Sequence, residues 1–287
     1  MNRHDPIRPE EYLEPSCPFC TDFYKPAEET VTPVDLRRMT EKLDEHLARN
    51  DTAAALRHLD YWRAEAIQGR DRRGELGIEN ERMGLLRKLG RKDEALESVD
   101  RALALTDALA MQGTLTDATT RLNCATVYKT FGRSDLALAL YAQARAVYER
   151  ELAPDDPRLG GLYNNLGLAL TDLDRFDEAR AVYQKALDIM ALAPNGALEA
   201  AITELNLADL AAKAQGLLQA EDEIERRLDR AEALLRQPEL PRNGYYAFVC
   251  DKCASVFDYY GRFLTAMELR QTAEDLYAGN GAGKKLL

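Results

Sequence analysis

Apolar residues recur at intervals of three and four from about Val34 onward, in a background rich in Leu, Ala, Glu and Arg. That period places apolar side chains on one face of an α-helix. No stretch shows the sustained alternation of β-branched residues that is typical of a strand. Proline-containing breaks interrupt the helical pattern at 152–157, 193–196 and 237–241. The sequence therefore predicts an all-α protein.

The two ends of the chain follow a different pattern. Six of the eleven prolines lie before residue 35, and a proline inside a helix removes a hydrogen-bond donor. We expect residues 1–32 to form a proline-rich extended arm that carries aromatic anchors such as Phe19 and Phe23. Helical repeats are expected over 33–278, followed by a flexible, glycine-rich tail over 279–287.

The helical region repeats itself at a spacing of about 42 residues. In the clearest unit, a helix, a tight turn and a second helix place small residues, Gly167 and Ala179, where the two helices are expected to cross. A shift of 42 residues places Ala125 at the position of Gly167 and Tyr141 at the position of Tyr183. Weaker copies precede and follow, which predicts about six hairpins. In the fifth, the second helix is expected to be extended.

The skeleton of this unit, Tyr163…Leu166-Gly167…Ala179…Tyr183…Ala186, resembles the tetratricopeptide repeat family, and the similarity extends over most of 34–278. The spacing near 42, longer than the usual 34, resembles the repeats of kinesin light chains. The resemblance implies an α-solenoid, a right-handed superhelix of antiparallel helix pairs. Its concave groove would be lined by the first helix of each pair.

Three asparagines occupy the same position in successive units, two residues before the crossing: Asn123, Asn165 and Asn206. An amide side chain both donates and accepts, which suits the backbone of an extended peptide. Kinesin light chain repeats are similar and use an asparagine at this position for that purpose, so the resemblance implies the same role here. The alternative is that the amides bond to neighbouring helices and hold the array together.

Other residues on the same face of the first helices are expected to set specificity for a peptide. Among them are Asn164, Leu168, Leu205, Lys129, Lys213 and Lys252. The lysines would pair with acidic side chains or a terminal carboxylate of a ligand. Alternatively, they lie at helix ends and are solvated.

Charge and composition narrow the class of partner. The chain has 38 Lys and Arg residues against 49 Asp and Glu residues, a net charge of −11. Nucleic acids and anionic membranes require a basic face, so neither is an expected partner. No apolar run reaches the roughly 18 to 20 residues of a membrane span. The first residues lack the apolar segment of a secretory signal, and five cysteines fit reduced thiols, so a cytoplasmic location is expected.

Candidate chemistry is sparse. The three histidines all lie before residue 60, which leaves no catalytic set of nucleophile, base and acid, and no cofactor is expected. Cys17 and Cys20 form a CxxC motif in the arm that leaves zinc binding or redox chemistry open. A second pair, Cys250 and Cys253, falls at core-facing helical positions and is better explained by packing.

These observations favour a non-catalytic scaffold or adaptor that binds an extended peptide segment of a protein partner in a concave groove. One alternative is a peptide-responsive sensor whose N-terminal arm occupies its own groove. Another is a zinc- or redox-dependent protein that uses Cys17 and Cys20. A homodimer through the end helices or the arm is also compatible with the sequence, because the end helices of a repeat array are exposed.

Overall fold

The computed structural model describes residues 30–49, 51–194 and 196–282. Most of the expected arm, with Cys17 and Cys20, lies outside these residues, as do residues 283–287 of the expected tail. The described part of the chain contains twelve α-helices and no strand. The prediction of an all-α protein is confirmed.

The helices follow one another as six consecutive pairs, and each helix packs most extensively against its partner in the pair or the next pair along the chain. The pairs are α1 (Leu36–Ala48) with α2 (Thr52–Gln68), α3 (Arg72–Lys88) with α4 (Lys92–Ala108), α5 (Leu115–Thr130) with α6 (Ser134–Glu151), α7 (Pro157–Asp172) with α8 (Phe176–Met190), α9 (Ala197–Gln215) with α10 (Glu221–Leu235), and α11 (Gly244–Tyr259) with α12 (Phe263–Ala282). The proline-containing breaks separate α6 from α7, α8 from α9 and α10 from α11, as predicted.

The turns inside the pairs repeat at the same spacing as the helices. From the second pair onward, each turn contains a residue with a positive φ: Gly90 (69°), Gly132 (76°), Asp174 (56°), Gly216 (88°) and Gly261 (80°). Glycine adopts this left-handed conformation without a steric penalty, whereas other residues do so at a cost. Asp174 is therefore the exception among these five turns.

Close packing at the helix crossing explains why Gly167 is small. A Cβ atom at Gly167 would lie 2.5 Å from the ring of Tyr183, which is completely buried between α7 and α8. The tyrosine ring thus occupies the space that a larger residue at 167 would need. The predicted role of Gly167 in the helix crossing is confirmed.

The core runs along the array in three overlapping clusters. Each cluster combines residues of neighbouring pairs, so that α5 contributes Val127 to the N-terminal cluster and α9 contributes Leu210 to the middle one. Cys250 and Cys253 lie in the C-terminal cluster, as expected from their positions. Burial raises the pKa of Cys250 to about 11 and that of Cys253 to about 12, which disfavours the reactive thiolate.

Two helix lengths differ from the prediction. The helix α10 has 15 residues, the same as α8, because the turn after Gly216 delays its start to Glu221. The helix α12 continues to Ala282, into the segment expected to be a flexible tail. Packing of Leu276 and Tyr277 against the core extends the helix toward the C-terminus.

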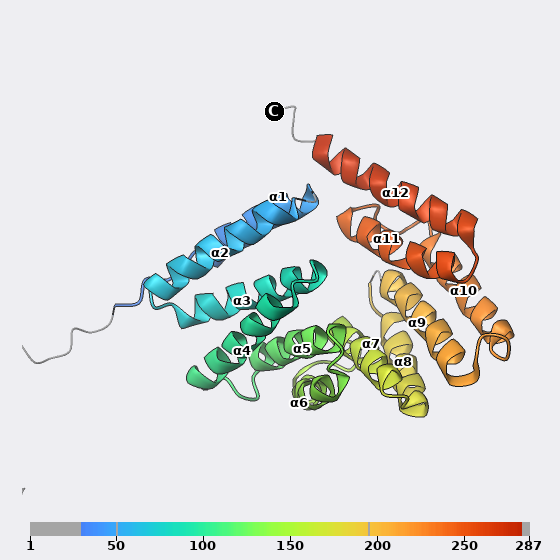
Figure 1. The fold of residues 1–287 in the computed structure, drawn as a ribbon, viewed down its shortest axis with the longest axis horizontal. Coiled ribbons are helices and arrows are strands. Elements are labelled where there is room, and N and C mark those ends of the chain that lie inside the picture. The colour runs from blue at the N-terminus through green and yellow to red at the C-terminus, as the bar shows by residue number, and fades with distance from the viewer. Residues whose placement is uncertain (1–29, 50, 195, 283–287) are drawn as a thin grey trace, which may run out of the picture.

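The array curves until its ends meet. One end of the first helix, α1, comes into contact with one end of the last, α12 (Figure 1). Further inside, Nζ of Lys88 on α3 lies 5.9 Å from the centroid of the Phe248 ring on α11, a cation–π contact between pairs that are distant in sequence. The concave face is therefore the inner wall of a nearly closed ring.

Among the described residues, no helix is both long enough and apolar enough to cross a membrane.

Candidate functional site

The concave face carries a pocket of about 470 Å³ where four first helices, α5, α7, α9 and α11, come together. It is lined by Lys129, Leu168, Thr171, Asp172, Tyr183, Asn206, Asp209, Ala212, Lys213, Ser255, Val256, Tyr259 and Tyr260. Four residues expected to contact a peptide thus line one cavity: Lys129, Leu168, Asn206 and Lys213. We refer to this cavity as the concave pocket.

The two lysines of the concave pocket share one carboxylate. Nζ of Lys213 lies 3.4 Å from Oδ1 of Asp172, and Nζ of Lys129 lies 3.7 Å from Oδ2. The hydroxyl of Ser134 donates a hydrogen bond of 3.1 Å to the same Oδ2. An ammonium group has three N–H donors, so each lysine retains donors for a ligand. The pocket therefore has a surplus of hydrogen-bond donors at this end.

A second carboxylate of the concave pocket, that of Asp209, is bound by an aromatic hydroxyl. Tyr260 donates a hydrogen bond of 2.7 Å to Oδ1 of Asp209. Burial raises the pKa of Asp209, although this hydrogen bond and the charge of Lys213 act in the opposite direction. The hydrogen bond between Tyr260 and Asp209 links the turn after α11 to α9 at one side of the pocket.

The hydroxyl of Tyr183, another residue of the pocket, is buried and has no hydrogen-bond partner among the described residues. Burial raises the pKa of Tyr183, and the nearby side chain of Thr171, whose hydroxyl donates to the carbonyl of Gly167, acts in the opposite direction. In the preceding pair, the equivalent hydroxyl of Tyr141 is 3.1 Å from that of Thr126. Leu168 occupies the position of Thr126 and offers no such partner.

Two of the three predicted asparagines connect successive first helices. Nδ2 of Asn123 donates to Oδ1 of Asn80 at 2.9 Å, and Nδ2 of Asn206 donates to Oδ1 of Asn164 at 2.9 Å. These bonds link α5 to α3 and α9 to α7. They are the contacts expected if the amides hold the array together, and both Asn123 and Asn206 are half-buried.

Asn165 differs from the other two. Leu122 occupies the position that Asn80 and Asn164 hold in their helices, so the amide of Asn165 finds no side chain on the preceding first helix. Its Nδ2 donates instead to the carbonyl of Gly161 at 3.0 Å, and its Oδ1 accepts no bond from the described residues. Within the part of the chain that the structure describes, Asn165 is thus the one predicted asparagine that makes no bond between helices.

Two residues expected on the groove surface are buried instead. Leu205 is 2% exposed and belongs to the core between α9, α10 and α11, because α9 is covered by helices on several sides. Asn164 is 6% exposed, and its Oδ1 accepts from Thr203 as well as from Asn206. The expectation that these two side chains face a ligand is thus corrected by their burial.

Lys252, the remaining predicted residue, lies on α11 outside the concave pocket. It has no carboxylate within ion-pairing distance in the described part of the chain. Partial burial lowers the pKa of Lys252, the nearby positive charges of Arg87 and Lys129 act in the same direction, and Glu199 opposes them. Arg87 on α3, Lys129 on α5 and Lys252 on α11 are thus close enough for their positive charges to affect one another.

Asp172 and Tyr183 are pocket residues that the sequence analysis did not assign to the groove. Asp172 follows Leu168 by four residues on the same helix, so the helical period could have placed both on one face. Tyr183 belongs to a second helix and was predicted as core; it is buried, and it also lines the pocket.

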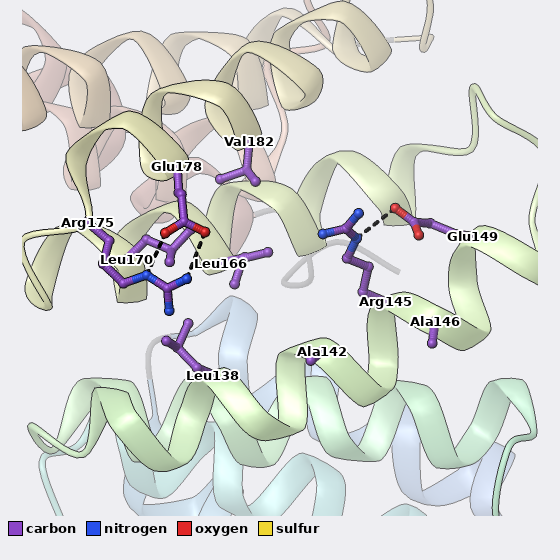
Figure 2. Close-up of a pocket in the computed structure, with 10 residues that line it drawn as sticks. All are labelled: Leu138, Ala142, Arg145, Ala146, Glu149, Leu166, Leu170, Arg175, Glu178 and Val182. Atoms are coloured by element: carbon purple, nitrogen blue, oxygen red, sulfur yellow. Dashed lines mark hydrogen bonds and ion pairs between the residues drawn. The ribbon is translucent and has the colours of Figure 1, made fainter.

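A different groove of about 420 Å³ lies between α6 and α8, on the outer side of the array (Figure 2). Leu138, Leu166 and Val182 give it an apolar surface. Its charged residues pair with one another: Arg145 with Glu149, and Arg175 with Glu178, each at 2.7 Å. This outer groove contains none of the residues predicted to bind a peptide, and its charges are already neutralised.

The described residues contain no group of three or more His, Cys, Asp or Glu side chains placed to hold a metal ion. Cys17 and Cys20 lie outside the described residues, so the zinc or redox hypothesis stays a prediction.

Two stretches of the chain, residues 118–158 and 160–191, match the tetratricopeptide repeat model. They cover α5 to α8, the two pairs with the clearest skeleton. The chain thus contains tetratricopeptide repeats, and the resemblance stated from the sequence is confirmed. Such repeats generally mediate interactions with other proteins and are typically not catalytic.

Several solved structures are similar to this chain. BtubC (BKLC) from P. vanneervenii has a TM-score of 0.49 and 17% identity, with 83% of this chain and 92% of that chain covered. Kinesin light chain-type, nearly identical TPR-like repeats from Podosopora anserina have a TM-score of 0.47 and 16% identity, with 71% and 95% covered. A tetratricopeptide repeat protein from Parabacteroides merdae has a TM-score of 0.40 and 17% identity, with 84% and 92% covered. A comparison with curated proteins finds no match.

Proposed function

We propose that this protein is a non-catalytic scaffold that holds an extended peptide segment of a partner protein against its concave face. The observation that carries the proposal is the concave pocket, where Lys129, Leu168, Asn206 and Lys213 from three first helices meet. A cavity lined by an apolar side chain and a few convergent polar groups is the usual form of a binding site.

The hydrogen-bond donors of the pocket support a peptide as the ligand. The shared carboxylate of Asp172 leaves N–H donors on Lys129 and Lys213, and peptide carbonyls and carboxylates are acceptors. Asn165, which forms no interhelical bond with the described residues, lies on α7 between the helices that carry these lysines. Its carbonyl oxygen can bond a peptide backbone.

The test uses peptides selected from a random display library on the unmodified chain. We expect Lys129→Ala/Lys213→Ala to weaken the binding of selected peptides by about tenfold or more, since hydrogen bonds to charged groups contribute about 1.5 to 3 kcal/mol each. Binding is measured by fluorescence anisotropy. Lys92→Ala is the matched control, because Lys92 is exposed on α4, outside the concave pocket.

Asn165→Ala separates a ligand-binding role from a structural one. We expect it to weaken peptide binding and leave the unfolding midpoint unchanged. Asn123→Ala, in contrast, removes the bond to Asn80 and should lower the midpoint. Peptide affinities that are unchanged in both the lysine variant and Asn165→Ala, with helical circular dichroism intact, would contradict the proposal.

A further inference from the structure

The first described residues lead the chain along the turn between α2 and α3, on the outer edge of the ring. The backbone N–H of Thr32 donates to the carbonyl of Gly69 at 2.8 Å, and that of Val34 donates to Oδ2 of Asp71 at 3.0 Å. Two hydrogen bonds thus fix the direction in which residues 30–34 run across this turn.

Two glycines make room for this segment. A Cβ atom at Gly69 would lie 2.5 Å from the carbonyl oxygen of Thr32, and one at Gly74 would lie 2.4 Å from Cγ2 of Val34. Neither distance is compatible with a side chain at those positions. The turn between α2 and α3 is therefore shaped to receive the extended chain.

The segment enters beside a pocket of about 670 Å³, which we refer to as the edge pocket. Val31 is one of its lining residues and is 56% exposed, and Ile67 on α2 is 47% exposed. Exposed apolar side chains that share one pocket offer a surface that another segment can cover. The basic side chains of the pocket are Arg70, Arg72, Arg73 and Arg101.

Two of these arginines lack an acidic partner in the described chain and occupy unfavourable positions. Arg101 binds both oxygens of Glu75, at 2.6 and 2.7 Å. Arg72 and Arg73 are exposed and have no carboxylate within ion-pairing distance among the described residues. They are the first two residues of α3, where the positive end of the helix dipole disfavours cations. The N-cap carboxylate of Asp71 offsets the helix dipole but forms no ion pair with either arginine, so further anions can pair with the two exposed guanidinium groups.

The chain itself supplies acidic residues at the required place. Residues 1–29 contain seven acidic and three basic residues, and Glu28 and Glu29 come two or three positions before Val31. An extended chain advances about 3.4 Å per residue, so both carboxylates can reach the rim of the edge pocket. Phe23 and Tyr24 precede these two residues and can lie at most about 30 Å from the edge pocket.

We propose that the segment preceding Thr30 docks in the edge pocket, with Glu28 and Glu29 paired to Arg72 and Arg73 and with apolar residues of the segment covering Ile67. This site is on the outer edge of the first two helix pairs, so it is distinct from the concave pocket and does not rest on the peptide-binding proposal. It also differs from the sequence hypothesis that the arm occupies the concave groove.

The test is the rate at which chymotrypsin cleaves the full-length chain after Phe23 and Tyr24, followed by mass spectrometry. We expect Arg72→Glu/Arg73→Glu to increase this rate about fivefold to tenfold, because two exposed ion pairs are replaced by repulsion. Glutamate suits the first turn of a helix, so the variant should retain its helical circular dichroism. Arg226→Glu is the matched control, since Arg226 is exposed on α10 near the other end of the array.

A reciprocal exchange of charge makes the test specific. Glu28→Lys/Glu29→Lys should also accelerate cleavage, and its combination with Arg72→Glu/Arg73→Glu should return the rate to within about twofold of the original, because the pairs are restored with reversed sign. A cleavage rate that Arg72→Glu/Arg73→Glu leaves unchanged would overturn the proposal. So would a combined variant that is cleaved as fast as either double variant.

Discussion

The α5–α6 and α7–α8 pairs are built on the same skeleton and differ in how completely their polar groups are satisfied. In the first, the hydroxyl of Tyr141 meets that of Thr126. In the second, Leu168 replaces the threonine, and the hydroxyl of Tyr183 has no partner in the described chain. The same contrast holds for the asparagines, since Asn123 bonds to α3 whereas Asn165 bonds within α7.

The difference shows which pair of the array contains side-chain polar groups that lack the hydrogen bonds made by their equivalents in the neighbouring pair. A buried polar group without a partner costs free energy, and proteins keep such groups mainly at sites with another role. In the α7–α8 pair, the unsatisfied hydroxyl of Tyr183 lines the concave pocket, and Asn165 makes no interhelical bond with the described residues. The α5–α6 pair thus serves as the reference pair for α7–α8. Substitutions can make these two pairs more alike or more different.

The largest effect is expected at the helix crossing. Gly167→Ala should lower the free energy of unfolding by about 2 kcal/mol, because the added methyl group overlaps the ring of Tyr183 and outweighs the better helix propensity of alanine. Urea unfolding followed by circular dichroism measures this. The reverse substitution in the reference pair, Ala125→Gly, should cost about 1 kcal/mol through helix propensity alone. If the Gly167→Ala variant is as stable as the original, Tyr183 does not set the spacing of the helices.

The tyrosine hydroxyls are expected to have effects of opposite sign. Tyr183→Phe should raise the free energy of unfolding by about 1 kcal/mol, because it removes a buried, unsatisfied hydroxyl, and Tyr141→Phe should lower it by about 1 kcal/mol. Thermal unfolding by calorimetry compares the two. In a Leu168→Thr background, where Tyr183 gains the partner that Tyr141 has, the gain from Tyr183→Phe should disappear. Equal effects of the two substitutions would contradict the comparison.

The smallest effect is expected in the turns. Asp174→Gly should raise the free energy of unfolding by about 0.5 kcal/mol, because glycine adopts the positive φ of this turn without strain. Gly132→Ala at the equivalent turn of the reference pair should lower it by about 1 kcal/mol. Chemical unfolding midpoints measured in parallel resolve the two shifts. If both changes move the midpoint in the same direction, the turns are not equivalent.

The sequence predicted the parts of the fold that depend on local pattern. The helical period, the proline-containing breaks and the small residue at 167 are local properties, and the three breaks fall between helices as expected. The length of α10 was predicted less well, because Ile224, Leu228 and Leu235 have the right period but do not show where the turn after Gly216 ends. Extension of α12 to Ala282 depends on packing of Leu276 and Tyr277, which the period alone does not show.

The candidate site was predicted in part. Lys129, Leu168, Asn206 and Lys213 follow from a single rule about which face of a first helix is exposed, and they line one pocket. The rule fails for Leu205, because α9 rests against several helices, and for Asn164 on α7, because Thr203 and Asn206 of α9 pack onto its amide and donate to it. Tyr183 could not be assigned to the pocket from its own helix, since a buried residue of a second helix follows the same period whether or not it reaches a cavity. The edge pocket depends on residues 30–34 crossing the α2–α3 turn, a tertiary contact without a periodic signal.

Contact between α1 and α12 alters the mechanics of the whole molecule. A repeat array with free ends behaves as a spring, since each unit touches only its neighbours and small rotations add up along its length. Where the two ends touch, a rotation in one unit must be compensated in the others if the contact is to persist, so the array resembles a ring more than a spring. A further hairpin added after α12 would then have to share the space in which α1 and α12 now meet.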